Sequence, residues 1–153
     1  MPDFSVRLAH LGLTLPEAPR PVASYVPAVR TGNLVFVSGQ IPIRAGELMA
    51  VGTVPGEVSV ERAQELARQC VLNGLAVLEA EVGSIDRLKR VVRVGCFVAS
   101  APGFGDQPKV ANGASDLLCE IFGEAGRHAR AAVGSVALPM HVPVEIEFVF
   151  EVE

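Results

Sequence analysis

The stretch Val144-Glu-Ile-Glu-Phe-Val-Phe-Glu-Val-Glu153 decides the fold class, because apolar and acidic side chains alternate along it. A period of two is that of a β-strand, in which successive side chains point to opposite faces. The apolar set, from Val144 to Val152, is expected to pack into a core. The opposite set carries four carboxylates, which must meet water, cations or a partner because bare buried carboxylates are too costly.

Two long helices are predicted before this strand. Ser59 is a good N-cap for the first helix and Gly83 ends it, and between them apolar residues recur three and four positions apart. The second helix spans residues 107–122, and Gly123 and Gly126 close it. Each helix therefore has one apolar stripe that can cover a sheet.

Further strands are predicted over residues 24–30 and 33–38, which form a hairpin, and over residues 47–51, 88–99 and 131–136. Pro27 places the first of these at a sheet edge or breaks it. A short helix that begins near Phe4 is limited by Gly12 and Pro16. Two helices against one mixed sheet give a two-layer α+β domain. We expect residues 1–17 to form a helical extension and residues 18–153 to form this domain.

Composition narrows the class of protein. The chain has 153 residues, of which half are apolar, enough for the core of one domain. A net charge of −4 argues against a general nucleic-acid binder. No secretory signal and no apolar run near the roughly 20 residues of a membrane helix is visible. Cys70, Cys96 and Cys119 lie in apolar stretches and are expected to be buried thiols, so a reducing cytoplasm is the expected compartment.

Two motifs carry a resemblance to a known family. Gly32-Asn-Leu-Val-Phe-Val-Ser-Gly-Gln-Ile-Pro42 resembles the hairpin of the RidA (YjgF-like) family, also described as L-PSP endoribonucleases. Ala129-Arg130, then Leu138-Pro139 and Val144-Glu-Ile-Glu147, resembles the C-terminal signature of that family. The resemblance covers residues 18–153 and implies a chorismate mutase-like fold. It also implies a homotrimer with ligand clefts between subunits and hydrolysis of 2-imino and 2-enamino acids to 2-keto acids and ammonia.

The resemblance assigns roles to particular residues. Arg130 matches a carboxylate-binding arginine and Glu145 matches a glutamate associated with the attacking water. Tyr25, Ser38 and Asn112 match residues of the substrate pocket. The sequence differs from the family archetype at two places, with His128 where proline is common and Ala132 where cysteine is common.

The residue types suit this chemistry, although each has a simpler interpretation. The planar fork of Arg130 could bind a carboxylate bidentately, or it could be a surface arginine. Glu145 could activate water, or it could be one acid on a solvated strand face. Tyr25 could bond the substrate or only pack, and Ser38 could donate to a ligand or satisfy the turn.

Three functions follow, in decreasing order of preference: an imine or enamine deaminase, a non-catalytic trimeric protein that binds small carboxylates, and an RNA-acting protein. Imine hydrolysis requires no cofactor, and none is expected. No metal is expected either, because His128 and His141 lack neighbouring ligands in the sequence. The basic run from Arg87 to Arg93 is interpreted as a solvated, ion-paired surface, so a nucleic-acid partner is not expected.

Overall fold

The computed structural model describes residues 3–21 and 23–153. Its helices are α1 (Phe4–His10), α2 (Val60–Val82) and α3 (Gln107–Phe122), with three 3-10 turns, η1 (Ile85–Arg87), η2 (Gly123–Gly126) and η3 (Pro139–His141). Its strands are β1 (Ala28–Thr31), β2 (Leu34–Gln40), β3 (Ile43–Arg44), β4 (Glu47–Leu48), β5 (Leu88–Ala99), β6 (Ala129–Ser135) and β7 (Val144–Val152).

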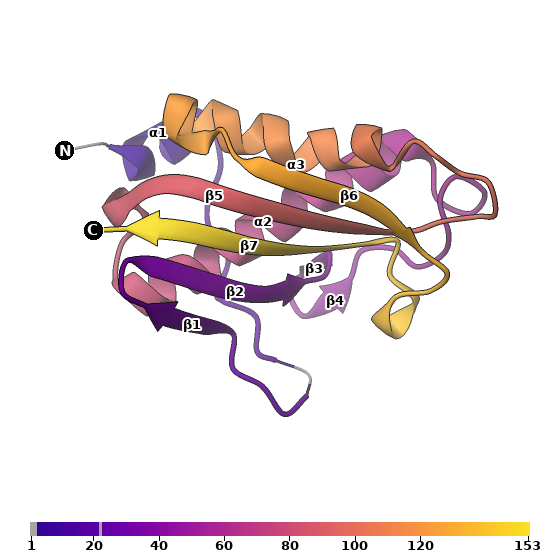
Figure 1. Cartoon of the computed structure of the whole chain (residues 1–153), viewed down its shortest axis with the longest axis horizontal. Coiled ribbons are helices and arrows are strands. Elements are labelled where there is room, and N and C mark those ends of the chain that lie inside the picture. The colour runs from indigo at the N-terminus through magenta and orange to yellow at the C-terminus, as the bar shows by residue number, and fades with distance from the viewer. Residues whose placement is uncertain (1–2, 22) are drawn as a thin grey trace.

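Five of the strands form one mixed sheet in the order β1-β2-β7-β5-β6. All neighbours are antiparallel except β5 and β6, which are parallel. Helices α2 and α3 cover one face of this sheet, and Figure 1 looks onto the other face, which no helix of the described residues covers. We call these the helix face and the open face. The predicted two-layer α+β fold is confirmed.

Buried and partly exposed side chains alternate along β7, as predicted, and the buried side packs against the helix layer. Residues on one side of this central strand are fully buried against α2, and those on the other side are partly exposed. Gly74 of α2 permits a close approach, since a Cβ there would lie 2.5 Å from the ring of Phe148. Phe148 in turn stacks on Phe150 with ring centroids 5.5 Å apart.

The predicted helix ends are also observed. The Ser59 side chain accepts a hydrogen bond from the backbone N–H of Arg62 at 3.0 Å, and Gly83 takes the left-handed conformation after the last turn of α2. Helix α3 begins at Gln107 and ends before Gly123, as expected. These local signals work because they satisfy backbone groups that a helix leaves unpaired at its ends.

Four predictions need correction. The strand predicted over residues 47–51 covers only Glu47–Leu48 and pairs with β3 in a separate two-stranded sheet. The first strand begins at Ala28, not at residue 24, so Tyr25 lies in a bend before it; Pro27 has no N–H to donate to a ladder. The strand predicted over residues 131–136 begins at Ala129, which places Arg130 inside β6. Cys119 is exposed on α3, because it points away from the sheet-facing stripe of that helix, whereas Cys70 and Cys96 are buried.

Candidate functional site

Arg130 lies on β6, the edge strand that pairs in parallel with β5. Its partner is Val94, which is fully buried, and paired residues project to the same face of a sheet. Arg130 therefore projects toward α3. There Nη1 donates to Oδ1 of Asn112 at 2.8 Å and to Oγ of Ser115 at 3.1 Å, and Nη2 donates to the carbonyl of Pro108 at 3.4 Å. We call this group the arginine site.

These contacts leave one edge of the guanidinium available. Arginine has five N–H donors, of which three point at acceptors on α3. The N–H of Nε and one N–H of Nη2 are left over, and no described residue accepts from Nε. Two parallel donors on one edge match the two oxygens of a carboxylate. The arginine site can therefore hold a carboxylate while it keeps its contacts to α3.

His128 contacts the arginine site through Ser115. The Nδ1 atom of His128 is 2.6 Å from the carbonyl oxygen of Gly126, and its Nε2 atom is 2.8 Å from Oγ of Ser115. A carbonyl only accepts, so Nδ1 carries a proton, and in the tautomer with its proton on Nδ1 the Nε2 atom accepts from the Ser115 hydroxyl. Ser115 then has lone pairs for Nη1 of Arg130, and the four groups form one connected chain.

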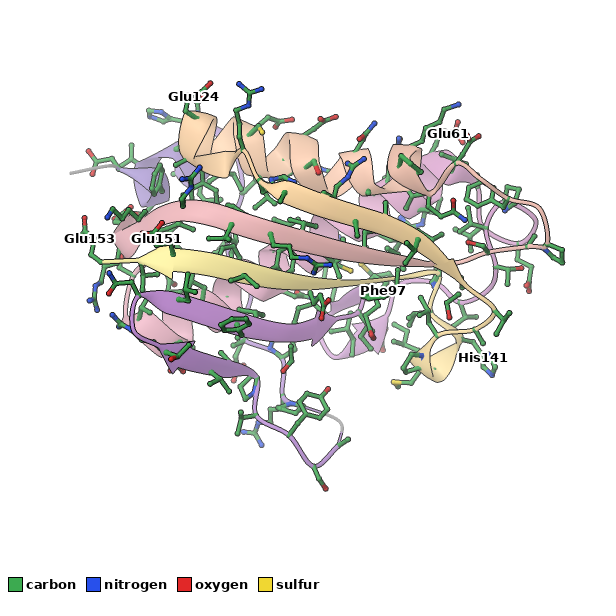
Figure 2. All side chains as sticks on the ribbon, in the orientation of Figure 1. Glu61, Phe97, Glu124, His141, Glu151 and Glu153 are labelled. Carbon is green, nitrogen blue, oxygen red and sulfur yellow. The ribbon has the colours of Figure 1, made fainter. Side chains whose placement is uncertain are left out.

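Glu145 belongs to a second group of residues, which lies on the open face of the sheet. It is paired with Phe97 on β5, which in turn pairs with Val133 on β6, and all three project to the open face. Figure 2 labels Phe97 at the end of the sheet where β7 begins, and Glu151 marks the opposite end of that strand. Arg130 and Glu145 of one chain therefore project to opposite faces of the sheet.

A β-bulge brings the hairpin motif against Glu145. Val37 pairs with Phe148 and Gln40 with Ile146, so two residues, Ser38 and Gly39, lie opposite one. A Cβ on Gly39 would lie 2.9 Å from Oε1 of Glu145, so a glycine is needed for the carboxylate to pack here. The Ser-Gly-Gln motif thus shapes the backbone beside Glu145.

The electrostatic surroundings of Glu145 favour its neutral form. The pKa of Glu145 is raised, first because burial disfavours the charged carboxylate and second because the carboxylate of Glu147 repels it. Glu147 has a cation of its own, Arg93, at 3.3 Å. No hydrogen bond or ion pair from a described residue reaches the carboxylate of Glu145. A raised pKa suits a group that must exchange protons near neutral pH.

A pocket adjoins Glu145 and contains three of the residues that the sequence singled out. Its empty space, which includes open solvent at its mouth, is about 610 Å³. Tyr25 and Ser38 line it together with Glu145, and the other walls are largely apolar. The Ser38 hydroxyl donates to the carbonyl of Val26 at 2.8 Å, so its proton is used within the turn. We call this the Glu145 pocket.

The structure therefore brings the predicted residues together in two groups. Arg130 and Asn112 share the arginine site, and Tyr25, Ser38 and Glu145 share the Glu145 pocket. Sequence reasoning missed Ser115 and the carbonyl of Pro108, although positions 108, 112 and 115 lie on one face of a helix by their spacing. It also missed the connector over residues 19–21, which forms one wall of the Glu145 pocket.

Other candidate chemistry finds little support among residues 3–21 and 23–153. No group of three or more potential metal-ligating side chains occurs in this part of the chain. Within the basic run, Lys89 lies 3.7 Å from Glu151 and Arg93 pairs with Glu147, so the predicted ion pairing is observed for two of its four basic residues. Burial raises the pKa of the Cys96 thiol to about 12, although Arg130 lowers it, so this thiol is protonated and inert.

None of the described helices is long and apolar enough to cross a membrane.

The domain is a mixed sheet covered by two helices, and it carries an arginine held by α3 and a mostly apolar pocket beside a carboxylate. The chain belongs to the family described as YjgF/chorismate mutase-like endoribonuclease, whose model matches residues 5–151. The resemblance to RidA (YjgF-like) proteins is thereby confirmed.

Particular relatives are similar over nearly the whole chain. It is 41% identical to protein TCP17 of Trypanosoma cruzi over 148 residues, covering 96% of this chain and 92% of that protein. It is 34% identical to a 2-iminobutanoate/2-iminopropanoate deaminase of Dermatophagoides farinae, covering 92% and 95%. The crystal structure of Atu1372 from Agrobacterium tumefaciens matches with a TM-score of 0.89 and 43% identity, covering 97% and 91%.

Proposed function

We propose that this protein hydrolyses 2-imino and 2-enamino acids to 2-keto acids and ammonia. The observation that carries this proposal is that the guanidinium of Arg130 keeps unused N–H donors beside its contacts to α3, and such donors can bind the carboxylate that all these substrates share. The relationship to a relative named as a 2-iminobutanoate/2-iminopropanoate deaminase supports it.

The proposed reaction needs only two groups from the protein. Arg130 fixes the substrate carboxylate, and Glu145 takes a proton from water as the oxygen adds to the imine carbon. The protonated Glu145 returns this proton to the nitrogen, which gives a carbinolamine. Glu145 then moves the proton of the new hydroxyl to the nitrogen, the C–N bond breaks, and ammonia leaves as the 2-keto acid forms. An enamine first gains a proton at carbon and loses one from nitrogen, and so becomes the imine. The raised pKa of Glu145 supports both halves of this proton transfer.

The two groups must come from different chains if they form one site. Arg130 projects to the helix face and Glu145 to the open face, so one chain does not present both to one small molecule. The open face also exposes apolar side chains, with Val29 54%, Phe36 46% and Val133 46% exposed. Such a surface favours a partner. The proposed assembly is a homotrimer whose ligand clefts lie between subunits.

No cofactor enters this scheme, because an imine already carries its own electrophilic carbon. The proposed compartment is the cytoplasm, where the thiols of Cys70, Cys96 and Cys119 would stay reduced. The most direct test is to generate 2-aminoacrylate with a serine dehydratase and to follow pyruvate release with and without this protein. Faster release is expected; a rate equal to that of the buffer control would contradict the deaminase proposal.

A second candidate is a non-catalytic protein that binds small carboxylates. The arginine site has all its contacts on α3 and β6, so it could hold a carboxylate without Glu145. Calorimetry with 2-oxobutanoate distinguishes the two candidates. Binding without any acceleration of imine hydrolysis would favour this second function.

A further inference from the structure

We infer that Ser115 and His128 are positioning residues for Arg130 and decide which edge of its guanidinium faces the ligand; this inference rests on the proposed role of Arg130. The starting observation is the connected chain that runs from the carbonyl of Gly126 through His128 and Ser115 to Nη1 of Arg130. Neither Ser115 nor His128 is needed to bind a carboxylate directly.

The chemistry of each group decides whether it donates or accepts in this chain of hydrogen bonds. Arginine only donates, so Ser115 must offer Arg130 a lone pair and must give its own proton to another acceptor. Nε2 of His128 is that acceptor, at 2.8 Å, and it is free to accept because Nδ1 donates to Gly126 at 2.6 Å. The backbone carbonyl at residue 126 therefore fixes the tautomer of His128, and the tautomer fixes the orientation of the Ser115 hydroxyl.

The hydrogen bonds to Asn112 and Ser115 limit which N–H groups of Arg130 can bind a ligand. With Asn112 and Ser115 both accepting from Nη1, this nitrogen has no donor left for a ligand. The Nε–Nη2 edge remains, and it can meet a carboxylate in one bidentate orientation. Without the serine, Nη1 would compete for the same carboxylate, and the side chain could rotate among several single-donor contacts.

This arrangement depends on the ring nitrogen of His128. A proline at that position offers no side-chain acceptor, so the hydroxyl of Ser115 would have to turn elsewhere. In a helix the usual alternative is the carbonyl four residues earlier. The further expectation is that position 128 tunes how rigidly Arg130 is held.

The test uses the native protein and five variants. Ser115→Ala removes the hydroxyl, and His128→Phe keeps a ring but removes the nitrogen acceptor. Ser115→Thr and His128→Gln keep a hydroxyl and an acceptor at the same reach. Cys119→Ala, an exposed change one turn further along α3, is the matched control. Thermal unfolding of every variant shows that each is folded.

Two readouts separate positioning from a merely structural role. In 15N NMR spectra, the Nη signals of Arg130 should be resolved in the native protein and averaged by rotation in Ser115→Ala and His128→Phe. Affinity for 2-oxobutanoate should fall about three- to tenfold in the same two variants, as expected for loss of one hydrogen bond. Ser115→Thr, His128→Gln and Cys119→Ala should stay close to the native protein in both readouts.

The outcomes also distinguish this inference from the proposed function. If the native protein binds no 2-keto acid, the proposed function fails, and the NMR signals of Arg130 still decide whether Ser115 and His128 hold it. Unchanged signals in both Ser115→Ala and His128→Phe would overturn the inference. A lower melting temperature with unchanged signals and affinity would likewise assign these residues a purely structural role.

Discussion

Arg130 and Glu145 project to opposite faces of the same sheet. Arg130 is in register with buried Val94, and Glu145 is in register with Phe97 on the open face. Because side chains alternate strictly along strands, this relationship cannot be changed by rotating a side chain. A shared site requires that one chain supply the arginine and another supply the glutamate.

Complementation between inactive variants tests this sharing. Arg130→Ala and Glu145→Gln should each be inactive alone, but mixed and reassembled chains should regain activity. With random assembly, about a quarter of the sites would combine an intact arginine with an intact glutamate, so about a quarter of native activity is expected. No recovery in mixed oligomers of two inactive variants would show that both residues act within one chain.

The oligomeric state is a separate prediction. Light scattering should give a mass of about 48 kDa, three times the 16.1 kDa chain. Val133→Arg places a charge on the open face and should shift the mass toward that of the monomer, while Val6→Arg, at an exposed position on α1, should not. A stable native monomer at micromolar concentration would contradict the shared-cleft model.

Removal of the guanidinium should abolish ligand binding. A bidentate contact between charged groups is worth about 1.5–3 kcal/mol, so Arg130→Ala should weaken 2-oxobutanoate binding about ten- to more than a hundredfold. Arg130→Lys should recover little, because an ammonium group lacks the planar fork. Arg127→Ala is the matched control, since Arg127 is exposed and pairs with Glu124 at 3.6 Å. Calorimetry and thermal unfolding on the same samples separate lost binding from lost stability.

Glu145→Gln should lower activity and raise stability. Loss of a general base costs about a hundredfold or more in the rate of the chemical step. The pKa of Glu145 is raised by burial and by Glu147, so its ionised form is disfavoured in the folded state. The native-state advantage of the protonated group is present at low pH and is lost as the pH rises through the raised pKa. The variant should therefore melt higher than the native protein at pH 7, and this gap should close in acid.

The pH profile of activity provides a further check on Glu145. Activity should fall as the pH drops below the raised pKa, because the base must be ionised to accept a proton. Glu147→Gln removes the repelling charge and should move this acidic limb to lower pH. Glu151→Gln, on the same strand at its far end, should leave the limb unchanged. An unshifted limb in Glu147→Gln would show that Glu145 is not the titrating group.

The carboxylate of Asp86 binds the start of helix α1, and the stability that this contact adds should depend on pH. Asp86 accepts from the backbone N–H of Ser5 at 2.9 Å and from its hydroxyl, and Phe4 packs edge-on against Phe122 at 4.7 Å. Burial raises the pKa of Asp86, but these hydrogen bonds outweigh it and the net pKa is lowered. The stabilisation is thus present above the unfolded pKa of about 3.9 and is lost as the pH falls. Asp86→Asn should cost about 0.5–1 kcal/mol at pH 7 and little in acid, with Asp116→Asn as the control in thermal unfolding.

How much of the site could be predicted differs between its parts. Arg130, Glu145 and Asn112 were identified from motifs, and their residue types fix what each can donate or accept. The partners on α3 could have been found in part, because Asn112 and Ser115 are three apart on a helix. The bond between Ser115 and His128 could not, because it joins a helix to the residue before a strand thirteen positions away.

The sequence by itself determined the two long helices, most of the strands and the side of β7 that is buried. Alternation along β7 and the three-and-four spacing along α2 are local patterns, and local geometry converts them directly into faces. The tertiary structure alone decided the strand order β1-β2-β7-β5-β6, the bulge at Ser38–Gly39 and the separation of Arg130 from Glu145. These depend on register between segments far apart in the chain, where a shift of one residue moves every side chain to the other face.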